Sequence, residues 1–379
     1  MDTPSFINRD PDLIMQEIKS QMETLLGREI YPAQFEQLIL QCICYREILL
    51  LERFNAGMSQ LLYQFSTAPI LDYIAALVAV ERLPAAYAGC IVKFTFIQGH
   101  GNIIIPADTR IASSNNTIFA TTEDILVQSN DTEARVFAEA QEAGADANGF
   151  PVGDVTKILD PVGFVTAVTN TTTTSGGSDS ETDESLRERI KLAPSQYSTA
   201  GSRQSYIFHA KSANPAIIDI SVSSPEPGTV KIVPLTEDEE YETLIQQIDE
   251  ICNSEKVRPL TDTVIVEAPV AVRYNLEVDI TLYAGSNAKN VSKKVYQALE
   301  KYTNEKSRKL GQDIIISHIT QICRLPEVYD ISVTHLAEVA SNGHGHGFNL
   351  TPANLTIDFN QVPKCTGITV TVNNDFVTE

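Results

Sequence analysis

The chain has 379 residues, of which 43% are hydrophobic and 20% are charged, a composition typical of a folded protein with several domains. Its formal net charge of -21 argues against binding to nucleic-acid backbones or to anionic membrane surfaces, both of which attract basic patches. The first residues do not resemble a signal peptide, and no apolar run reaches the about 20 residues that a membrane-spanning helix needs. We therefore expect a soluble protein of the cytoplasm.

Six cysteines show no metal-ligand spacing and lie mostly within apolar patterns. We interpret them as free, buried thiols of a reducing compartment. They are Cys42, Cys44, Cys90, Cys252, Cys323 and Cys365.

Residues 1–88 are predicted to be a mainly helical segment. Apolar residues at helical spacing indicate one helix that ends at Gly27, a long helix from Gln34 to about Gln64 and a third from Pro69 to about Arg82. The long helix carries apolar side chains on several sides, so we expect it to pack on several sides. Two arrangements stay open, a closed three-helix bundle or a core bundle shared with other subunits. The candidate assembly interface consists of Phe35, Leu38, Ile39, Cys42, Tyr45, Leu49 and Phe54.

Residues 89–175 are predicted to form a small antiparallel β domain. Short apolar stretches alternate with turns rich in Gly, Asn and Ser, a pattern typical of a barrel or a sandwich. The domain ends in the polar stretch TNTTTTSGGSDS at residues 169–180, which we predict to be a flexible linker.

The segment from residue 176 to residue 229 has the clearest local pattern in the chain. Thr182 is a good N-cap, and Asp183 and Glu184 place negative charge in the first turn of a helix that Pro194 ends. Leu186, Ile190 and Ala193 form its apolar stripe.

A second helix is predicted from Ser198 or Thr199 to Asn214, where the following proline stops it. Residues 218–222 then alternate as a strand, residues 225–228 (Pro-Glu-Pro-Gly) turn, and a return strand begins. This pattern predicts a folding unit and not a ligand pocket.

Residues 176–335 as a whole are predicted to form an α+β domain. The order of helices and strands indicates a split βαβ sandwich of the ferredoxin-like kind. The stretch Pro-Ala-Ile-Ile-Asp-Ile-Ser-Val at residues 215–222 is echoed at residues 326–333, so an ancient duplication is one interpretation. Residues 336–379 are predicted to be a short β-rich C-terminal segment with strands at 355–359 and 367–372.

Groups with catalytic or metal-binding potential are few. His344 and His346 stand two residues apart in a glycine-rich loop without a third ligand nearby, so we interpret them as a solvated loop tip. His209 and His318 lie within apolar helical patterns and are predicted to be at least partly buried. The acidic cluster of Asp179, Glu181, Asp183 and Glu184 fits a linker and a helix start better than an acid–base pair. We expect no catalytic residue, no metal and no cofactor.

The pattern of the 176–229 segment resembles the baseplate J-like protein family of contractile phage tails and related injection machines. Residues 105–111 and 119–121 resemble the barrel segment of the same family, although Asp108 stands where we expect a glycine, a departure that would alter the turn type. The positions that carry the resemblance are Gly177, Asp179, Thr182, Asp183, Glu184, Leu186, Arg187, Glu188, Arg189, Thr199, Ala200, Gly201, Tyr206, Ala210, Pro215, Val222, Pro225, Pro227, Gly228 and Thr229.

The resemblance implies a structural wedge subunit of a contractile-tail baseplate, assembled in the bacterial cytoplasm as part of a phage tail, tailocin or injection particle. It implies that two copies in different conformations pair with a smaller wedge partner through a shared helical core. Six such wedges would surround the central hub and spike, next to sheath-proximal proteins, and couple target contact to sheath contraction. It implies no enzyme activity, no nucleic acid and no membrane insertion.

Two other classes of protein compete with this interpretation. A secreted or surface carbohydrate-binding β-protein fits the strand-rich middle and the Thr/Ser/Gly stretch, but it predicts a signal peptide that we do not find. An enzyme would be tested first by substituting His344 and His346.

Overall fold

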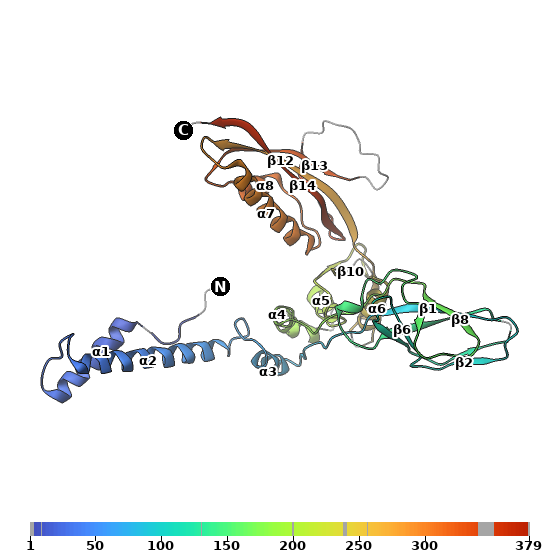
Figure 1. The fold of residues 1–379 in the computed structure, drawn as a ribbon, viewed down its shortest axis with the longest axis horizontal. Coiled ribbons are helices and arrows are strands. Elements are labelled where there is room, and N and C mark those ends of the chain that lie inside the picture. The colour runs from blue at the N-terminus through green and yellow to red at the C-terminus, as the bar shows by residue number, and fades with distance from the viewer. Residues whose placement is uncertain are drawn as a thin grey trace. The chain divides into compact units, whose positions relative to one another are not determined.

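The chain is a mixed α+β protein, as the sequence predicts, and Figure 1 shows its computed structural model. The structure describes residues 4–8, 10–129, 131–198, 201–237, 241–255, 257–339 and 352–377. Within them the chain divides into two units, which comprise residues 1–82 with 183–193, and residues 83–182 with 194–379. No helix of this described part is long and apolar enough to span a membrane.

The first unit begins with a helical hairpin of α1 (Pro11–Leu26) and α2 (Phe35–Ser59). The Asp10 side chain caps α1 by accepting from the Asp12 amide, and Gly27 ends the helix at a left-handed φ of 65°. Asn55 on α2 ties down the chain before α1, because its amide oxygen accepts from Ile7 N at 3.0 Å and its nitrogen donates back to the Ile7 carbonyl. The predicted helix end at Gly27 is confirmed.

The helical hairpin does not close into a three-helix bundle with α3 (Ile70–Leu77). Instead α3 contacts α4 (Asp183–Leu192), which begins where the sequence predicts. The third helix is shorter than predicted, because Ala79 takes a positive φ of 56° and the Val80 amide bonds back to the Ala75 carbonyl. The first unit therefore consists of two helix pairs, and of the two arrangements left open for residues 1–88 the closed three-helix bundle is not formed.

The second unit starts with the predicted antiparallel β domain. Its six-stranded sheet has the order β7-β3-β4-β6-β1-β8, and the edge strands β7 and β8 also contact each other, so the sheet nearly closes into a barrel. Phe94, Ile111 and Phe119 are fully buried in its core. The strands are β1 (Gly89–Phe96), β3 (Arg110–Ala112), β4 (Ile118–Thr121), β6 (Glu133–Ala140), β7 (Lys157–Ile158) and β8 (Val165–Asn170), and β2 (Ile103–Ile105) pairs antiparallel with β5 (Ile125–Val127) in a separate two-stranded sheet.

The stretch at residues 169–180 is not the flexible linker that its composition predicts. Gly89 and Ser175 exchange backbone hydrogen bonds of 2.8 and 3.0 Å, and Ala86 and Ser178 exchange another pair. Thr174 and Ser178 are buried. The prediction was wrong because the Thr and Ser residues provide the polar groups that hold this segment to the barrel, instead of leaving it solvated.

The middle of the chain forms a first three-stranded sheet, in the order β11-β10-β9. The strand β10 runs antiparallel to β9 and parallel to β11, and α6 makes the crossover between the parallel pair. The elements are α5 (Arg203–Lys211), β9 (Asp219–Ser223), β10 (Thr229–Leu235), α6 (Glu242–Cys252) and β11 (Thr263–Val266).

The C-terminal part forms a second three-stranded sheet, in the order β13-β12-β14, with α7 and α8 packed against it. The elements are β12 (Val270–Tyr283), α7 (Ala288–Ser307), α8 (Ile316–Cys323), β13 (Val328–Glu338) and β14 (Gln361–Val377). Two separate sheets replace the single ferredoxin-like sandwich predicted for residues 176–335, because β12 pairs with β14 and not with β10. The predicted C-terminal strand is confirmed, whereas residues 355–359 contribute only an isolated bridge from Leu355 to Ile314.

The sequence echo corresponds to one local structure used twice. In both places a helix, α5 or α8, leads through a proline into a strand that pairs antiparallel with the central strand of its sheet. The connectivity differs, however, because β9 precedes its central strand β10 whereas β13 follows its central strand β12.

Candidate functional site

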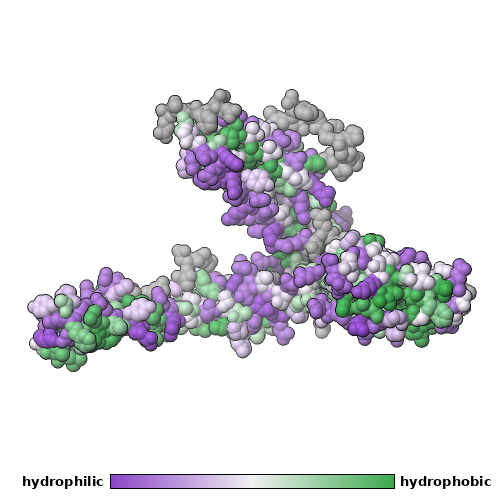
Figure 2. All heavy atoms as spheres, viewed as in Figure 1, coloured by the Kyte–Doolittle hydropathy of each residue, from purple (hydrophilic) through white to green (hydrophobic). Residues whose placement is uncertain are grey.

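The surface that stands out in the first unit is the outer side of α2. Only four of its 25 residues are buried, although most of the helix is apolar. Two of the four are polar, Asn55 and Ser59, so the buried side is not the main apolar side. On the face shown in Figure 2, hydrophobic residues lie over the α1–α2 hairpin.

The structure divides the predicted assembly interface by exposure. Cys42 is also exposed, while Leu49 is partly buried. Exposed fractions are 72% for Phe35, 62% for Leu38, 36% for Ile39, 62% for Tyr45 and 49% for Phe54.

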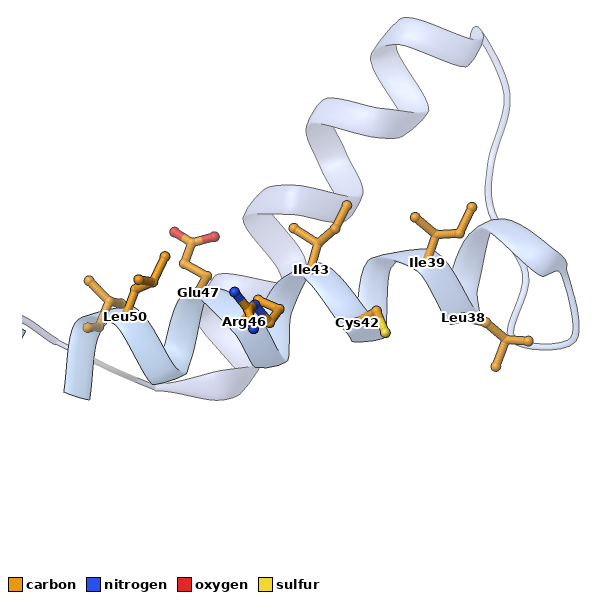
Figure 3. A pocket seen from close by; sticks show the side chains of 8 residues that line it. Leu38, Ile39, Cys42, Ile43, Arg46, Glu47 and Leu50 are labelled. Carbon is orange, nitrogen blue, oxygen red and sulfur yellow. The ribbon is translucent and has the colours of Figure 1, made fainter. Parts of the chain in front are cut away.

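An open apolar surface runs along α2, and all of its lining residues belong to this one helix (Figure 3). It is therefore a helix face and not an enclosed cavity. Ile39 and Ile43 project from one side of α2, and Leu38 projects from another. The sequence analysis missed three apolar lining residues, Ile43, Leu50 and Leu51, because it did not record them as part of the helix pattern. Their i, i+7 and i+8 spacing was the available signal. It also did not include Arg46 and Glu47, which line the same surface.

A second cluster joins the signature residues of α4 to the chain around α3. The Arg82 guanidinium lies 2.7 Å from a carboxylate oxygen of Asp183 and 2.7 Å from one of Asp72. The Ala68 amide also donates to Asp183, at 3.4 Å. Burial alone would raise the pKa of the Asp183 carboxyl, but the hydrogen bonds from Arg82 and Ala68 lower it below its ordinary value.

The two signature arginines bind backbone oxygens. Arg187 donates from Nη2 to the Ser66 carbonyl at 2.9 Å, and the buried Arg189 donates from Nη1 to the Glu81 carbonyl at 3.1 Å. Leu186 is fully buried on the same helix. Glu184, in contrast, has a side chain that is 93% exposed and lies 3.6 Å from Arg187. The helix α4 therefore fastens residues 66–82 within the first unit.

Gly201 and Tyr206, on the second unit, share one partner that the sequence analysis did not single out. The Tyr206 hydroxyl donates to Asp262 Oδ2 at 3.0 Å. A Cβ on Gly201 would lie 2.7 Å from the same oxygen, and Gly201 has a left-handed φ of 67°. Tyr206 therefore binds the Asp262 carboxylate, and Gly201 leaves the space that this carboxylate occupies.

Three further positions of the family resemblance, Pro215, Pro225 and Gly228, lie at turns. Pro215 follows Asn214, whose side-chain oxygen accepts from the Ala216 amide at 2.9 Å. Pro225 is exposed between β9 and β10, and Gly228 closes that turn at a φ of 81° with its carbonyl accepting from Thr263 N. The helix α5 begins at an N-cap later than predicted, Ser202, while Thr199 and Ala200 lie outside the described residues.

The residues considered for chemistry are separated or used structurally. The Glu181 carboxylate accepts from the Leu83 amide at 3.0 Å, and Asp179 accepts from the Ala145 amide at 3.3 Å. His344 and His346 lie outside the described residues, within which no group of three His, Cys, Asp or Glu side chains could hold a metal.

Two smaller predictions can be compared with the side chains. His209 is partly buried as predicted, but His318 is exposed, because α8 turns Ile319 and Cys323 inward. Asp108 takes a φ of 61°, so it keeps the backbone conformation for which a glycine was expected. All six cysteines are free, and four of them are buried.

Comparison with protein families gives three matches in chain order. Residues 91–177 match the baseplate J-like protein barrel domain, residues 198–268 the baseplate J-like central domain, and residues 274–371 the baseplate J-like protein C-terminal domain. The chain therefore belongs to the baseplate J-like family, and the resemblance stated from its sequence is confirmed.

An individual relative agrees with this assignment. Baseplate protein J of Escherichia phage P2 is 32% identical over 166 residues, which are 43% of this chain and 55% of the P2 protein. The chain thus matches about half the length of this relative. Among solved structures, a chain of the anti-feeding prophage baseplate covers 93% of this chain and 92% of its own length, with 12% identity and a TM-score of 0.40.

Proposed function

We propose that this chain is a structural subunit of a contractile-tail baseplate, built into the wedges that surround the central hub. The family matches support the baseplate, and the uncovered apolar face of α2 supports an assembled subunit. In this proposal the α2 face packs against helices of a second copy and of a smaller wedge partner. The wedges together would form a ring around the hub, and this ring would couple target contact to sheath contraction.

The exposed face of α2 is the observation that carries the proposal. Leu38 and Leu50 are 62% and 59% exposed, and Ile43 is 45% exposed. Full burial of a side chain of this size stabilises by about 1.5–3 kcal/mol. At about half exposure, an unassembled chain lacks roughly half of that free energy at each position. Contiguous exposed apolar residues mark interaction sites.

The contacts of α4 hold the segment that follows the α1–α2 helix pair. Arg82, Asp183 and Arg187 hold residues 66–82, which follow α2 after a connection at residues 60–65. In the proposed assembly, a force on the helices packed around α2 would therefore reach the α3–α4 pair through the hydrogen-bonded residues 66–82.

Particle assembly in the bacterium that produces the particle tests the proposal. The triple substitution Leu38→Ser, Ile43→Ser and Leu50→Ser removes the apolar face, and we expect intact tails to fall at least tenfold in electron micrographs, since burying the exposed half of three such side chains contributes about 2 kcal/mol or more. The control is Gln41→Ser, an exposed polar position on the same helix, which leaves assembly unchanged. Normal tails from the triple variant would contradict the proposal.

A further inference from the structure

Two connections link the barrel sheet to the small β2–β5 sheet. The β1–β6 ladder reaches Thr95 opposite Glu133, and the β2–β5 ladder begins with Ile103 opposite Val127. Residues 97–102 lead from β1 to β2, and the residues between β5 and β6 lead back. We call residues 97–102, 128, 129, 131 and 132 the joint.

His100 links the two sides of the joint through both of its ring nitrogens. Nδ1 lies 2.7 Å from the Gly101 carbonyl oxygen, and Nε2 lies 2.7 Å from the Asp131 carbonyl oxygen. The residue is 4% exposed, and its ring centroid lies 5.5 Å from that of Phe96 at the end of β1. The ring is therefore held between the two connections and covered by them.

Both partners of the ring are carbonyl oxygens, which can only accept a hydrogen bond. A neutral imidazole has one N–H and one nitrogen lone pair, so one of the two short contacts would place a lone pair against a carbonyl oxygen. An imidazolium donates from both nitrogens and satisfies both contacts. The geometry therefore matches the protonated ring and conflicts with either neutral tautomer.

The charges next to the ring favour the same state. Within the joint as the structure describes it, Asp131 is the charged residue, and its carboxylate accepts from the Gln128 amide at 3.0 Å. Glu133, at the start of β6, lies 3.0 Å from the Lys93 ammonium. The neighbouring β1 contributes the uncharged ring of Phe96. An imidazolium at this place thus has a carboxylate nearby.

The other hydrogen bonds across the joint are neutral. The Phe96 amide donates to the Thr132 carbonyl at 3.0 Å, and the Ser129 amide donates to Asn102 Oδ1 at 3.2 Å. Charge-assisted hydrogen bonds are roughly twice as strong as neutral ones. A sheet of two strands is at best marginally stable by itself, so the contacts of the joint matter for β2 and β5.

We propose that His100 is a pH-sensitive tie in the joint. As an imidazolium it holds the β2–β5 sheet to the barrel, and its deprotonation removes one of its two hydrogen bonds and loosens that sheet. This inference goes beyond the proposed function and does not depend on the α2 face.

The direction of the pH dependence follows from the contacts of the ring. The Gly101 and Asp131 carbonyls raise the pKa of His100 above its ordinary value, although desolvation opposes them. The stabilisation is therefore complete below the unfolded pKa of about 6.5 and is lost as the pH rises through the higher folded pKa. An acidic medium keeps the tie, and an alkaline medium releases it.

Nitrogen-15 NMR of the intact chain with labelled histidine reads the charge of the ring. His100→Gln identifies the His100 signals by their loss. At about pH 6 we expect both ring nitrogens to be protonated, and one of them to lose its proton as the pH is raised. A His100 ring with an unprotonated nitrogen at about pH 6 would overturn the proposal.

Hydrogen exchange measures the consequence for the β2–β5 sheet. Between about pH 6 and about pH 9, we expect the protection factors of its amides to fall by roughly threefold to tenfold, as the loss of one hydrogen bond does, while those of β1 and β6 stay constant. The fall should be absent in His100→Gln and present in the control His318→Gln, which removes an exposed imidazole on α8.

Three results of the exchange experiment would overturn the tie. They are constant protection of β2 and β5 in the unsubstituted chain, an equal fall in β1 and β6, and the same fall in His100→Gln. The first two need no variant, so the proposal is tested even if His100→Gln does not fold.

Discussion

Arg82 donates to Asp183 at 2.7 Å although 101 residues separate them, and the whole barrel lies between them in the sequence. The pair belongs to the first unit, so the chain leaves that unit after Arg82, builds the barrel and returns at Asp183. The acidic first turn of α4 thus serves both the helix and a long-range contact. Asp183, one of the positions that carry the family resemblance, is therefore the residue at which the chain re-enters the first unit.

Breaking this pair should loosen the first unit locally. Asp183→Asn removes the charge while it keeps the shape of the side chain, and we expect a loss of about 1–2 kcal/mol, because charge-assisted hydrogen bonds contribute more than neutral ones and this pair is partly screened by solvent. Hydrogen exchange of α3 and α4 measures the effect. Glu184→Gln, one residue along and almost fully exposed, should leave the exchange rates unchanged.

The barrel contains a carboxylate whose titration can be followed directly. The Arg110 side chain and backbone amide donate to Asp160 at 2.9–3.0 Å, which lowers the pKa of Asp160 to about 2. Because the folded pKa lies below the unfolded value of about 4, the stabilisation is complete above pH ~4 and is lost as the pH falls through about 2. Carboxyl NMR titration should show this, and Arg110→Gln should return the pKa toward its ordinary range. An unchanged pKa in that variant would contradict the assignment.

The backbone of Gly177 lies so close to its neighbours that we expect no larger side chain to be tolerated at this position. A Cβ there would clash with the Gly144 carbonyl oxygen and lie 2.9 Å from Asn148 Oδ1, which accepts from the Gly177 amide. Gly177→Ala should therefore destabilise the barrel by about 1–3 kcal/mol, as overpacking does. Hydrogen-exchange protection of β1 and β6 measures this. Gly101→Ala, where a Cβ meets nothing within 4 Å, is the matched control, and equal effects at both positions would refute the explanation.

Gly201 and Tyr206 both lie against the Asp262 carboxylate, so a substitution at either position should disturb the same contact. Tyr206→Phe removes the hydroxyl that donates to Asp262, and we expect a loss of about 0.5–1.5 kcal/mol. Gly201→Ala should cost more, because it adds both a clash and a strained φ. Gly149→Ala, with a φ of 79° and open space around it, isolates the contribution of φ. Denaturant unfolding of each variant separates these contributions.

Local structure was predictable where one physical signal dominated. The glycine at position 27 ended α1, the unbroken alternation around Leu276 formed β12, and the charged first turn at Asp183 began α4. In each case the signal lies within one element, so no knowledge of tertiary packing was needed.

The failures came from contacts that link distant residues. The polar stretch around Thr174 resembles a linker until its partners Gly89 and Phe150 are known. The prediction of one ferredoxin-like sandwich failed because strand order does not reveal which strands pair, and β12 found β14 beyond residue 360. For the candidate site, the sequence identified the apolar side chains of α2, but only the structure shows that α1 leaves Leu38 and Ile43 uncovered.

Electron cryo-microscopy of intact particles from the bacterium that encodes this chain tests the baseplate proposal most directly. The account predicts density for the chain in the baseplate around the hub, with Leu38, Ile43 and Leu50 of α2 buried against helices of other subunits. A complete baseplate without this chain, or one in which the α2 face remains exposed to solvent, would contradict it.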